Sequence, residues 1–221
     1  MTSLLKLMGI MALFFASTFI VAKAMGWLSL EQIELWLAQA QSLSAVTVVV
    51  AVVFLLFLDL FIAVPTLSIM MLGGYFVGAH LGWFAAFSGT LLAGVCGYGL
   101  SALYGEKLVN LVVKDDAKRQ ELRAQFRRHG ILMILLSRAM PILPEVTACM
   151  SGISRMRFLT FLLAWCAVNL PYTFIAAYAG SISTLDNPIP AILTATALTA
   201  FFWIGWGLLK HFLLKTPVST Q

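Results

Sequence analysis

One stretch in the second half of the chain combines apolar sequence with ionic residues and prolines. The apolar run 131–136 is followed closely by Arg138, Pro141, Pro144 and Glu145, and apolar sequence resumes beyond them. Pro141 and Pro144 predict the end of any helix that enters here, because proline lacks a backbone donor and clashes with the preceding turn. An arginine or glutamate inside a bilayer costs about 2.5–3.5 kcal/mol on insertion scales, so such residues usually face protein or water. We therefore expect a break in a membrane-embedded segment, with ionic groups at its tip.

The composition of the chain supports this membrane setting. Of the 221 residues, 61% are apolar and 10% are charged, and the mean hydropathy is +0.96. A soluble domain of this length needs a polar surface that these residues do not supply, so we predict an all-α integral membrane protein. The net charge of +5 does not indicate nucleic-acid binding. Half of the lysines and arginines fall between Lys107 and Arg128, where they are typical of a cytoplasmic loop.

The pattern of apolar runs divides the chain into three parts. Residues 1–42 are expected to hold a retained first transmembrane helix, in preference to a cleaved signal peptide, and a short helix that is either interfacial or an ordinary connector. Residues 43–185 form the main domain, and its charged segment 105–130 is expected in the cytoplasm, either as amphipathic helices or as a solvated loop. Residues 186–221 supply a last transmembrane helix and a cytoplasmic C-terminal tail.

Small residues recur at helical spacing in the main domain. Two series have members four residues apart, and such ridges without large side chains let another helix backbone approach closely. A proline inside the apolar run 158–179 predicts a kink, and the asparagine two residues before it is expected to hydrogen-bond the backbone that the proline frees. The first series is Gly74, Gly78 and Gly82, and the second is Gly89, Ala93, Gly97, Ser101 and Gly105. The proline is Pro171 and the asparagine is Asn169.

The two proline regions form an internal repeat. Segments 64–73 and 143–152 align without a gap, so that Pro65 pairs with Pro144 and Gly73 with Gly152. The same register places Asp59 opposite Arg138, and a long apolar span follows each copy. The cytoplasmic charged segment lies between the copies, so the two regions should enter the membrane from opposite faces.

These observations predict an inverted repeat with two opposed re-entrant helical hairpins plus about four transmembrane helices. Broken helices that meet near the membrane midplane are common in secondary transporters. We hypothesise that Asp59 and Arg138 approach each other where the tips meet, because an ion pair offsets part of the cost of two buried charges. The alternative is that each side chain reaches its own membrane interface.

Several of these residues together resemble a known family. The motif Arg138-x-x-Pro141-x-x-Pro144, followed by 151–154 and Phe158, is similar to the second signature of the VTT-domain or DedA superfamily, also called SNARE-associated. Pro65, Ser68 and the glycines that follow them are similar to the first signature of this superfamily; these glycines are Gly73, Gly74, Gly78 and Gly82. The resemblance covers about residues 45–185.

The resemblance implies two facing re-entrant hairpins and the movement of lipids between leaflets of the cell inner (plasma) membrane, as a flippase or scramblase. It implies that Arg138 contacts a lipid phosphate and that Asp59 is the acidic partner. The implied partners are membrane phospholipids or polyprenyl phosphate, with protons as a coupling ion. Two departures from the DedA pattern weaken the implied polyprenyl-phosphate substrate and the implied proton coupling. Pro144 stands where DedA proper has a second arginine, and Leu67 stands where it has an aspartate.

The candidate substrate-binding residues are Arg138, Asp59 and Glu145. Glu145 is either a proton carrier or an acid that caps the returning helix arm. The residues expected to shape the hairpin backbone are Pro65, Gly73, Gly74, Pro141, Pro144 and Gly152. The histidines and cysteines lack the spacing of a catalytic triad or metal site, so no enzymatic activity, cofactor or metal is predicted. Two other functions compete with lipid translocation: a proton-coupled secondary transporter of a small ion or solute, and a non-transporting membrane scaffold.

Overall fold

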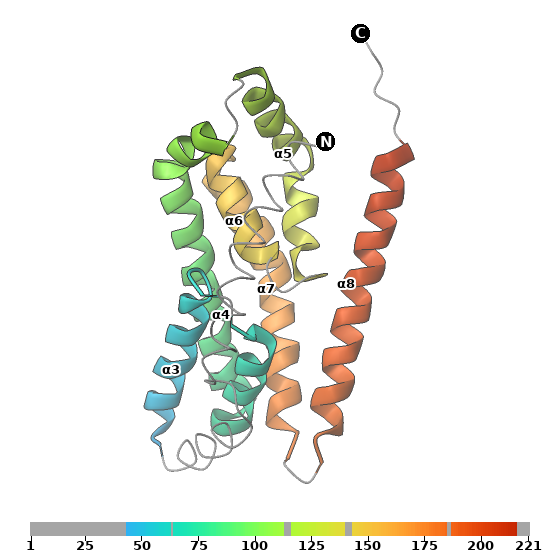
Figure 1. Cartoon of the computed structure of the whole chain (residues 1–221). Coiled ribbons are helices and arrows are strands. Elements are labelled where there is room, and N and C mark those ends of the chain that lie inside the picture. Colours follow the sequence, from blue (N-terminus) through green and yellow to red (C-terminus); the bar gives the residue numbers. More distant parts are fainter. Residues whose placement is uncertain (1–42, 63, 113–115, 140–142, 185–186, 216–221) are drawn as a thin grey trace.

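The computed structural model describes residues 43–62, 64–112, 116–139, 143–184 and 187–215. The helices expected within residues 1–42 lie outside these ranges. Over the described residues the structure contains α-helices, one short 3₁₀ helix and no strand, which confirms the all-α prediction. The elements are α3 (Ala45–Leu58), α4 (Thr66–Val112), α5 (Asp116–Leu135), η1 (Ser137–Ala139), α6 (Leu143–Ile153), α7 (Phe158–Ser181) and α8 (Ile189–Lys215) (Figure 1).

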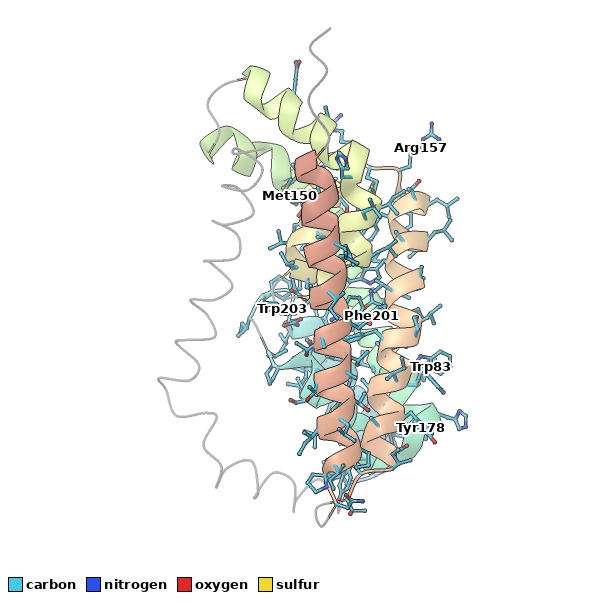
Figure 2. The ribbon with its side chains drawn as sticks, turned by 90° about the vertical axis from the view of Figure 1, so that its right-hand side faces the viewer. Trp83, Met150, Arg157, Tyr178, Phe201 and Trp203 are labelled. Atoms are coloured by element: carbon cyan, nitrogen blue, oxygen red, sulfur yellow. The ribbon has the colours of Figure 1, made fainter. Side chains whose placement is uncertain are left out.

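By length and composition, two helical stretches could cross a membrane: Thr66–Gly105 of α4, which includes the reversal at Gly78 described below, and all of α7. The outer surface of the bundle is apolar as well. Phe201 and Trp203 on α8 are 69% and 59% exposed, and their side chains project outward from the helix (Figure 2). A soluble monomer rarely exposes large contiguous apolar patches, whereas lipid tails match such a surface.

The first helical hairpin joins α3 to the start of α4. Ser44 caps α3, because its Oγ accepts a hydrogen bond from the Thr47 amide at 3.2 Å. The chain reverses after Leu58, and Pro65 immediately precedes the first residue of α4. A Cβ atom on Gly73 would lie 3.3 Å from the Val52 side chain, so the first part of α4 returns directly beside α3.

A second reversal occurs inside α4, at Gly78. Gly78 has φ 80° and ψ 169°, a conformation that glycine adopts readily and other residues rarely do. A Cβ on Gly82 would lie 2.6 Å from the Gly74 Cα, whereas residues eight apart in a continuous helix are separated by about 12 Å. The prediction that Gly74, Gly78 and Gly82 form one ridge is therefore wrong, but the predicted close approach of another backbone is present at Gly74 and Gly82. These glycines instead let the chain fold back tightly on itself.

Replacing Gly78 with alanine should destabilise the protein through the backbone alone. No atom lies within 4 Å of an added Cβ at this position, so steric contact contributes nothing. Residues other than glycine in this φ/ψ region cost about 1–3 kcal/mol. We expect a lower thermal unfolding temperature in detergent for Gly78→Ala. The control is Gly207→Ala in α8, where an added Cβ also meets open space but the helix has no reversal. Equal stability of the two variants would contradict this explanation.

The second helical hairpin consists of α5, η1 and α6. The charged segment does not form a separate loop throughout, because α5 begins within it at Asp116 and continues to Leu135 as one arm of the hairpin. Pro141 lies outside the described residues. Pro144 lies in the first turn of α6, where a helix tolerates proline because the missing amide hydrogen has no partner there. Figure 1 shows this hairpin reversing at mid-height, from the end of the bundle opposite to the first.

The returning arm of each hairpin packs on the long helix that follows the other hairpin. An added Cβ on Gly74, in the first returning arm, would overlap the carbonyl oxygen of Ala177 in α7. An added Cβ on Gly152, in α6, would overlap the carbonyl oxygen of Tyr98 in α4. This exchange of partners is the packing expected of an inverted repeat.

The second predicted ridge is a continuous face of α4 and packs on both hairpins. Gly89 faces Leu56 of α3, where an added Cβ would lie 2.8 Å from the Leu56 Cβ. Gly105, at the other end of the ridge, faces Ile153 of α6. The prediction of tight packing is confirmed for this series, and α3 and α6 are the partner helices.

Candidate functional site

The two hairpin tips meet at a small cavity inside the bundle, which we call the tip cavity. Asp59 comes from the first tip, Arg138 from η1 at the second tip, and Glu145 from the first turn of α6. The space is small, with room for about one water molecule. The lining residues are Leu56, Asp59, Leu60, Thr90, Ala93, Gly94, Arg138, Glu145, Ala148 and Trp165. The three candidate substrate-binding residues therefore share one site.

Asp59 holds the first tip together and also contacts the second. Its side chain is buried, and Oδ1 accepts a hydrogen bond from the Val64 amide at 3.0 Å, which closes the turn between α3 and α4. The Asp59 carboxyl group also lies close to the Glu145 carboxyl group, which comes from the other hairpin. The two side chains thus bring the hairpins into contact at their tips.

Arg138 bonds to α7 in preference to the carboxyl groups. Its Nε donates to Asn169 Oδ1 at 3.1 Å, and its Nη2 donates to the same oxygen. The guanidinium carbon lies 4.8 Å from the centroid of the Tyr172 ring, within the range of a cation–π interaction. Asp59 and Arg138 line the same cavity and attract each other electrostatically, while each makes its hydrogen bonds elsewhere.

The role of Asn169 differs from the expected one. Pro171 frees the carbonyl of Ala167, four residues before it, but the Asn169 Nδ2 donates to the Trp165 carbonyl at 2.8 Å. The other end of the amide accepts from Arg138. The expectation that Asn169 satisfies the backbone freed by Pro171 is therefore wrong, and α7 continues through Pro171 as one helix.

Sequence reasoning did not identify Tyr172 and Trp165 as site residues. Trp165 is buried against the tip cavity, and its Nε1 donates to the Thr90 carbonyl at 3.2 Å. Trp165, Asn169 and Tyr172 are spaced four and three residues apart, so they share one face of α7. In the sequence, two aromatic residues at helical spacing on either side of a buried asparagine could have indicated that Trp165 and Tyr172 belong to the site.

Helix α8 covers the side of the site at Tyr172. The Phe202 ring packs edge-on against the Tyr172 ring with centroids 5.8 Å apart. An added Cβ on Gly205 would lie 2.9 Å from the Leu136 side chain, which immediately precedes η1. A displacement of α8 would therefore uncover Tyr172 and the second tip together.

The backbone-shaping candidates lie in the two hairpins as described above, with Pro141 outside the described ranges. Within the part of the chain that the structure describes, no three His, Cys, Asp or Glu side chains are grouped so that they could hold a metal ion.

The family comparison adds an independent result. A family model for the VTT domain matches residues 64–182, more than half of the chain. The chain belongs to the VTT-domain (DedA) family. No curated protein and no solved structure matches it. The match runs from the end of the first tip to the end of α7, so this VTT domain includes the whole second hairpin and the returning arm of the first. The family is one of membrane-associated proteins, in keeping with the apolar helices α4 and α7.

Proposed function

We propose that this VTT-domain protein moves membrane lipids between leaflets by passing the lipid headgroup between the two hairpin tips. The observation that carries the proposal is the convergence of Arg138, Asp59 and Glu145, from opposite hairpins, on one cavity. Ionic groups inside a membrane are costly and usually mark the path of a polar substrate.

In this proposal both hairpins are re-entrant, and their tips meet near the membrane midplane. The end of the bundle that carries the basic segment 105–130 faces the cytoplasm, following the positive-inside rule, and the C-terminus lies on the same side. The membrane is the cell inner membrane. The apolar outer surface then lies in lipid, where the acyl chains of a moving lipid would remain.

Arg138 is the proposed contact for the headgroup phosphate. A guanidinium presents a planar set of donors that fits two phosphate oxygens at once. Phospholipids and polyprenyl phosphates both carry such a phosphate. Because the cavity has room for only about one water, the tips must separate before a headgroup can enter.

A leaflet-exchange assay tests the proposal directly. The full-length protein is reconstituted into liposomes that contain a fluorescent phospholipid, and a membrane-impermeant quencher is added outside. If the protein exchanges lipids, the fluorescence should fall below the level that remains in empty liposomes, because inner-leaflet lipid becomes accessible. Fluorescence that stops at the level of empty liposomes would overturn the proposal.

The two carboxyl groups in the tip cavity favour a second candidate, proton-coupled transport of a small ion or solute. Asp59 and Glu145 come from different hairpins, so a change in the charge of either carboxyl group would change the interaction between the tips. In such a transporter, uptake into the liposomes follows an imposed pH gradient and lipid exchange is absent.

Replacing Asp59 with asparagine should alter the dependence of transport on pH, because Glu145 is then the one titratable carboxyl group among the residues that line the tip cavity. The amide still accepts from the Val64 amide and can donate to Glu145, so we expect the fold to persist, with a similar unfolding temperature. The measurement is the rate of exchange or uptake across a pH series, with the wild type as reference. A variant that keeps the pH dependence of the wild type would exclude Asp59 as the coupling group.

A further inference from the structure

We infer that Asn169 is a positioning residue that holds Arg138 without neutralising it, so that the guanidinium keeps its positive charge for an anionic headgroup. The inference rests on the proposed function and adds a second residue to the same site. It starts from an unexpected pairing: two carboxyl groups line the tip cavity, yet the hydrogen-bond acceptor for Arg138 is a neutral amide.

The orientation of the Asn169 amide is determined by its surroundings. Its Nδ2 faces the Trp165 carbonyl oxygen at 2.8 Å, and a carbonyl can only accept a hydrogen bond. The amide oxygen must therefore point the other way, toward Arg138. Asn169 is 1% exposed, and its own carbonyl accepts from Thr173 at 2.7 Å, so the residue is held on both sides.

Tyr172 completes a neutral cradle around the guanidinium. The ring lies beneath the guanidinium and offers the negative face of its π system without a full charge. The Phe202 ring packs against the edge of Tyr172 and keeps it in place. The Asn169 amide and the Tyr172 ring both orient the Arg138 guanidinium, and neither carries a full charge that would neutralise it.

This cradle leaves part of the guanidinium for a ligand. Of the five N–H groups of an arginine, the one on Nε and one of the two on Nη2 are directed at Asn169. Nη1 has no hydrogen-bond partner among the residues that the structure describes. A carboxylate at position 169 would accept hydrogen bonds from the same two nitrogens, but it would also neutralise the charge of the guanidinium. The electrostatic attraction between Arg138 and an anionic headgroup would then be much weaker.

Asn169→Asp tests this inference, because it changes charge with almost no change in shape. An aspartate gains a charge-assisted bond with Arg138 and loses the Nδ2 hydrogen bond to the Trp165 carbonyl, so the two changes oppose each other in stability. A purely structural role predicts that exchange follows the unfolding temperature, whereas our inference predicts that exchange falls roughly tenfold even where the variant remains folded at the assay temperature. The matched control is Asn187→Asp, which adds the same charge at an exposed turn and should exchange lipids like the wild type. Normal exchange by Asn169→Asp would overturn the inference.

A second variant keeps the test decisive if Asn169→Asp folds poorly. Asn169→Ser leaves the charge of Arg138 free but holds it loosely, so exchange should fall several-fold. Combining it with Arg138→Lys should add little further loss, because both changes remove the oriented fork. Fully additive losses would show that the two residues act independently, and the inference would be wrong.

A binding measurement separates this inference from the proposed function. Phosphatidylglycerol, an anionic lipid, is added to the full-length protein in detergent, and the shift in unfolding temperature is recorded. We expect a shift for the wild type and for Asn187→Asp, and a much smaller one for Asn169→Asp. If the wild type shows this pattern but exchanges no lipid, the proposed function fails and the role of Asn169 stands. Equal shifts for all three proteins would overturn the role of Asn169.

Discussion

Replacing Arg138 with glutamine is expected to lower lipid exchange about ten- to a hundredfold. Hydrogen bonds to a charged group contribute about 1.5–3 kcal/mol, and each 1.4 kcal/mol corresponds to a factor of ten in rate or affinity. Glutamine keeps much of the length and polarity of the side chain but has neither the charge nor the planar fork. The measurement is leaflet exchange in proteoliposomes at equal protein content, with the unfolding temperature recorded in parallel.

Two further arginine variants show whether charge, geometry or general basicity matters. Arg138→Lys keeps the charge and loses the fork, so its exchange should lie between those of the wild type and Arg138→Gln. Arg157→Gln removes an exposed arginine just before α7, at one end of the bundle and outside the tip cavity (Figure 2), and should exchange lipids like the wild type. Exchange by stably folded Arg138→Gln at the wild-type rate would favour the interpretation of the tips as a scaffold that only holds the fold.

Replacing Gly74 or Gly180 with valine is expected to prevent stable folding of the bundle. The two glycines make a reciprocal contact between α4 and α7: Gly74 lies against the Ala177 carbonyl, and Gly180 against the Met71 carbonyl. An added Cβ would overlap a backbone oxygen in each case, and backbone cannot move aside as a flexible side chain can. Overpacking typically costs about 1–3 kcal/mol, and two main chains in contact place these sites at or above the upper end.

The matched control for these variants is Gly99, also in α4. No atom lies within 4 Å of an added Cβ there, so Gly99→Ala should be neutral or stabilise the protein by up to about 1 kcal/mol through helix propensity. The measurement is the yield of folded protein in detergent and its unfolding temperature. Wild-type stability of Gly74→Val would mean that α4 and α7 are not in backbone contact at this point.

The hairpin architecture could be predicted from local features of the sequence. Apolar length indicates membrane helices, and Pro65 and Pro144 mark where helices restart after each reversal. The gapless alignment of the two proline regions predicts equivalent copies, which agrees with the exchange of packing partners by Gly74 and Gly152. The family match covers the same region of the chain.

The Gly78 reversal could not be predicted, because a glycine ridge and a glycine turn look alike in sequence. The small residues Gly74, Gly78 and Gly82 are four residues apart, and so are those of the second series, Gly89, Ala93, Gly97, Ser101 and Gly105. The first series nevertheless spans a reversal, whereas the second lies on one helix. The difference depends on which surfaces are available to cover each segment, and that information is not local.

The sequence alone determined that Asp59, Arg138 and Glu145 are exceptional, because a charge within an apolar run is costly wherever the run lies. Only the tertiary structure decided which groups they meet. Asp59 accepts a hydrogen bond from Val64 and lies close to Glu145, and Arg138 donates to Asn169 over the Tyr172 ring. A hydrogen bond depends on positions to within a few tenths of an ångström, and those positions arise from the packing of helices that lie far apart in the chain.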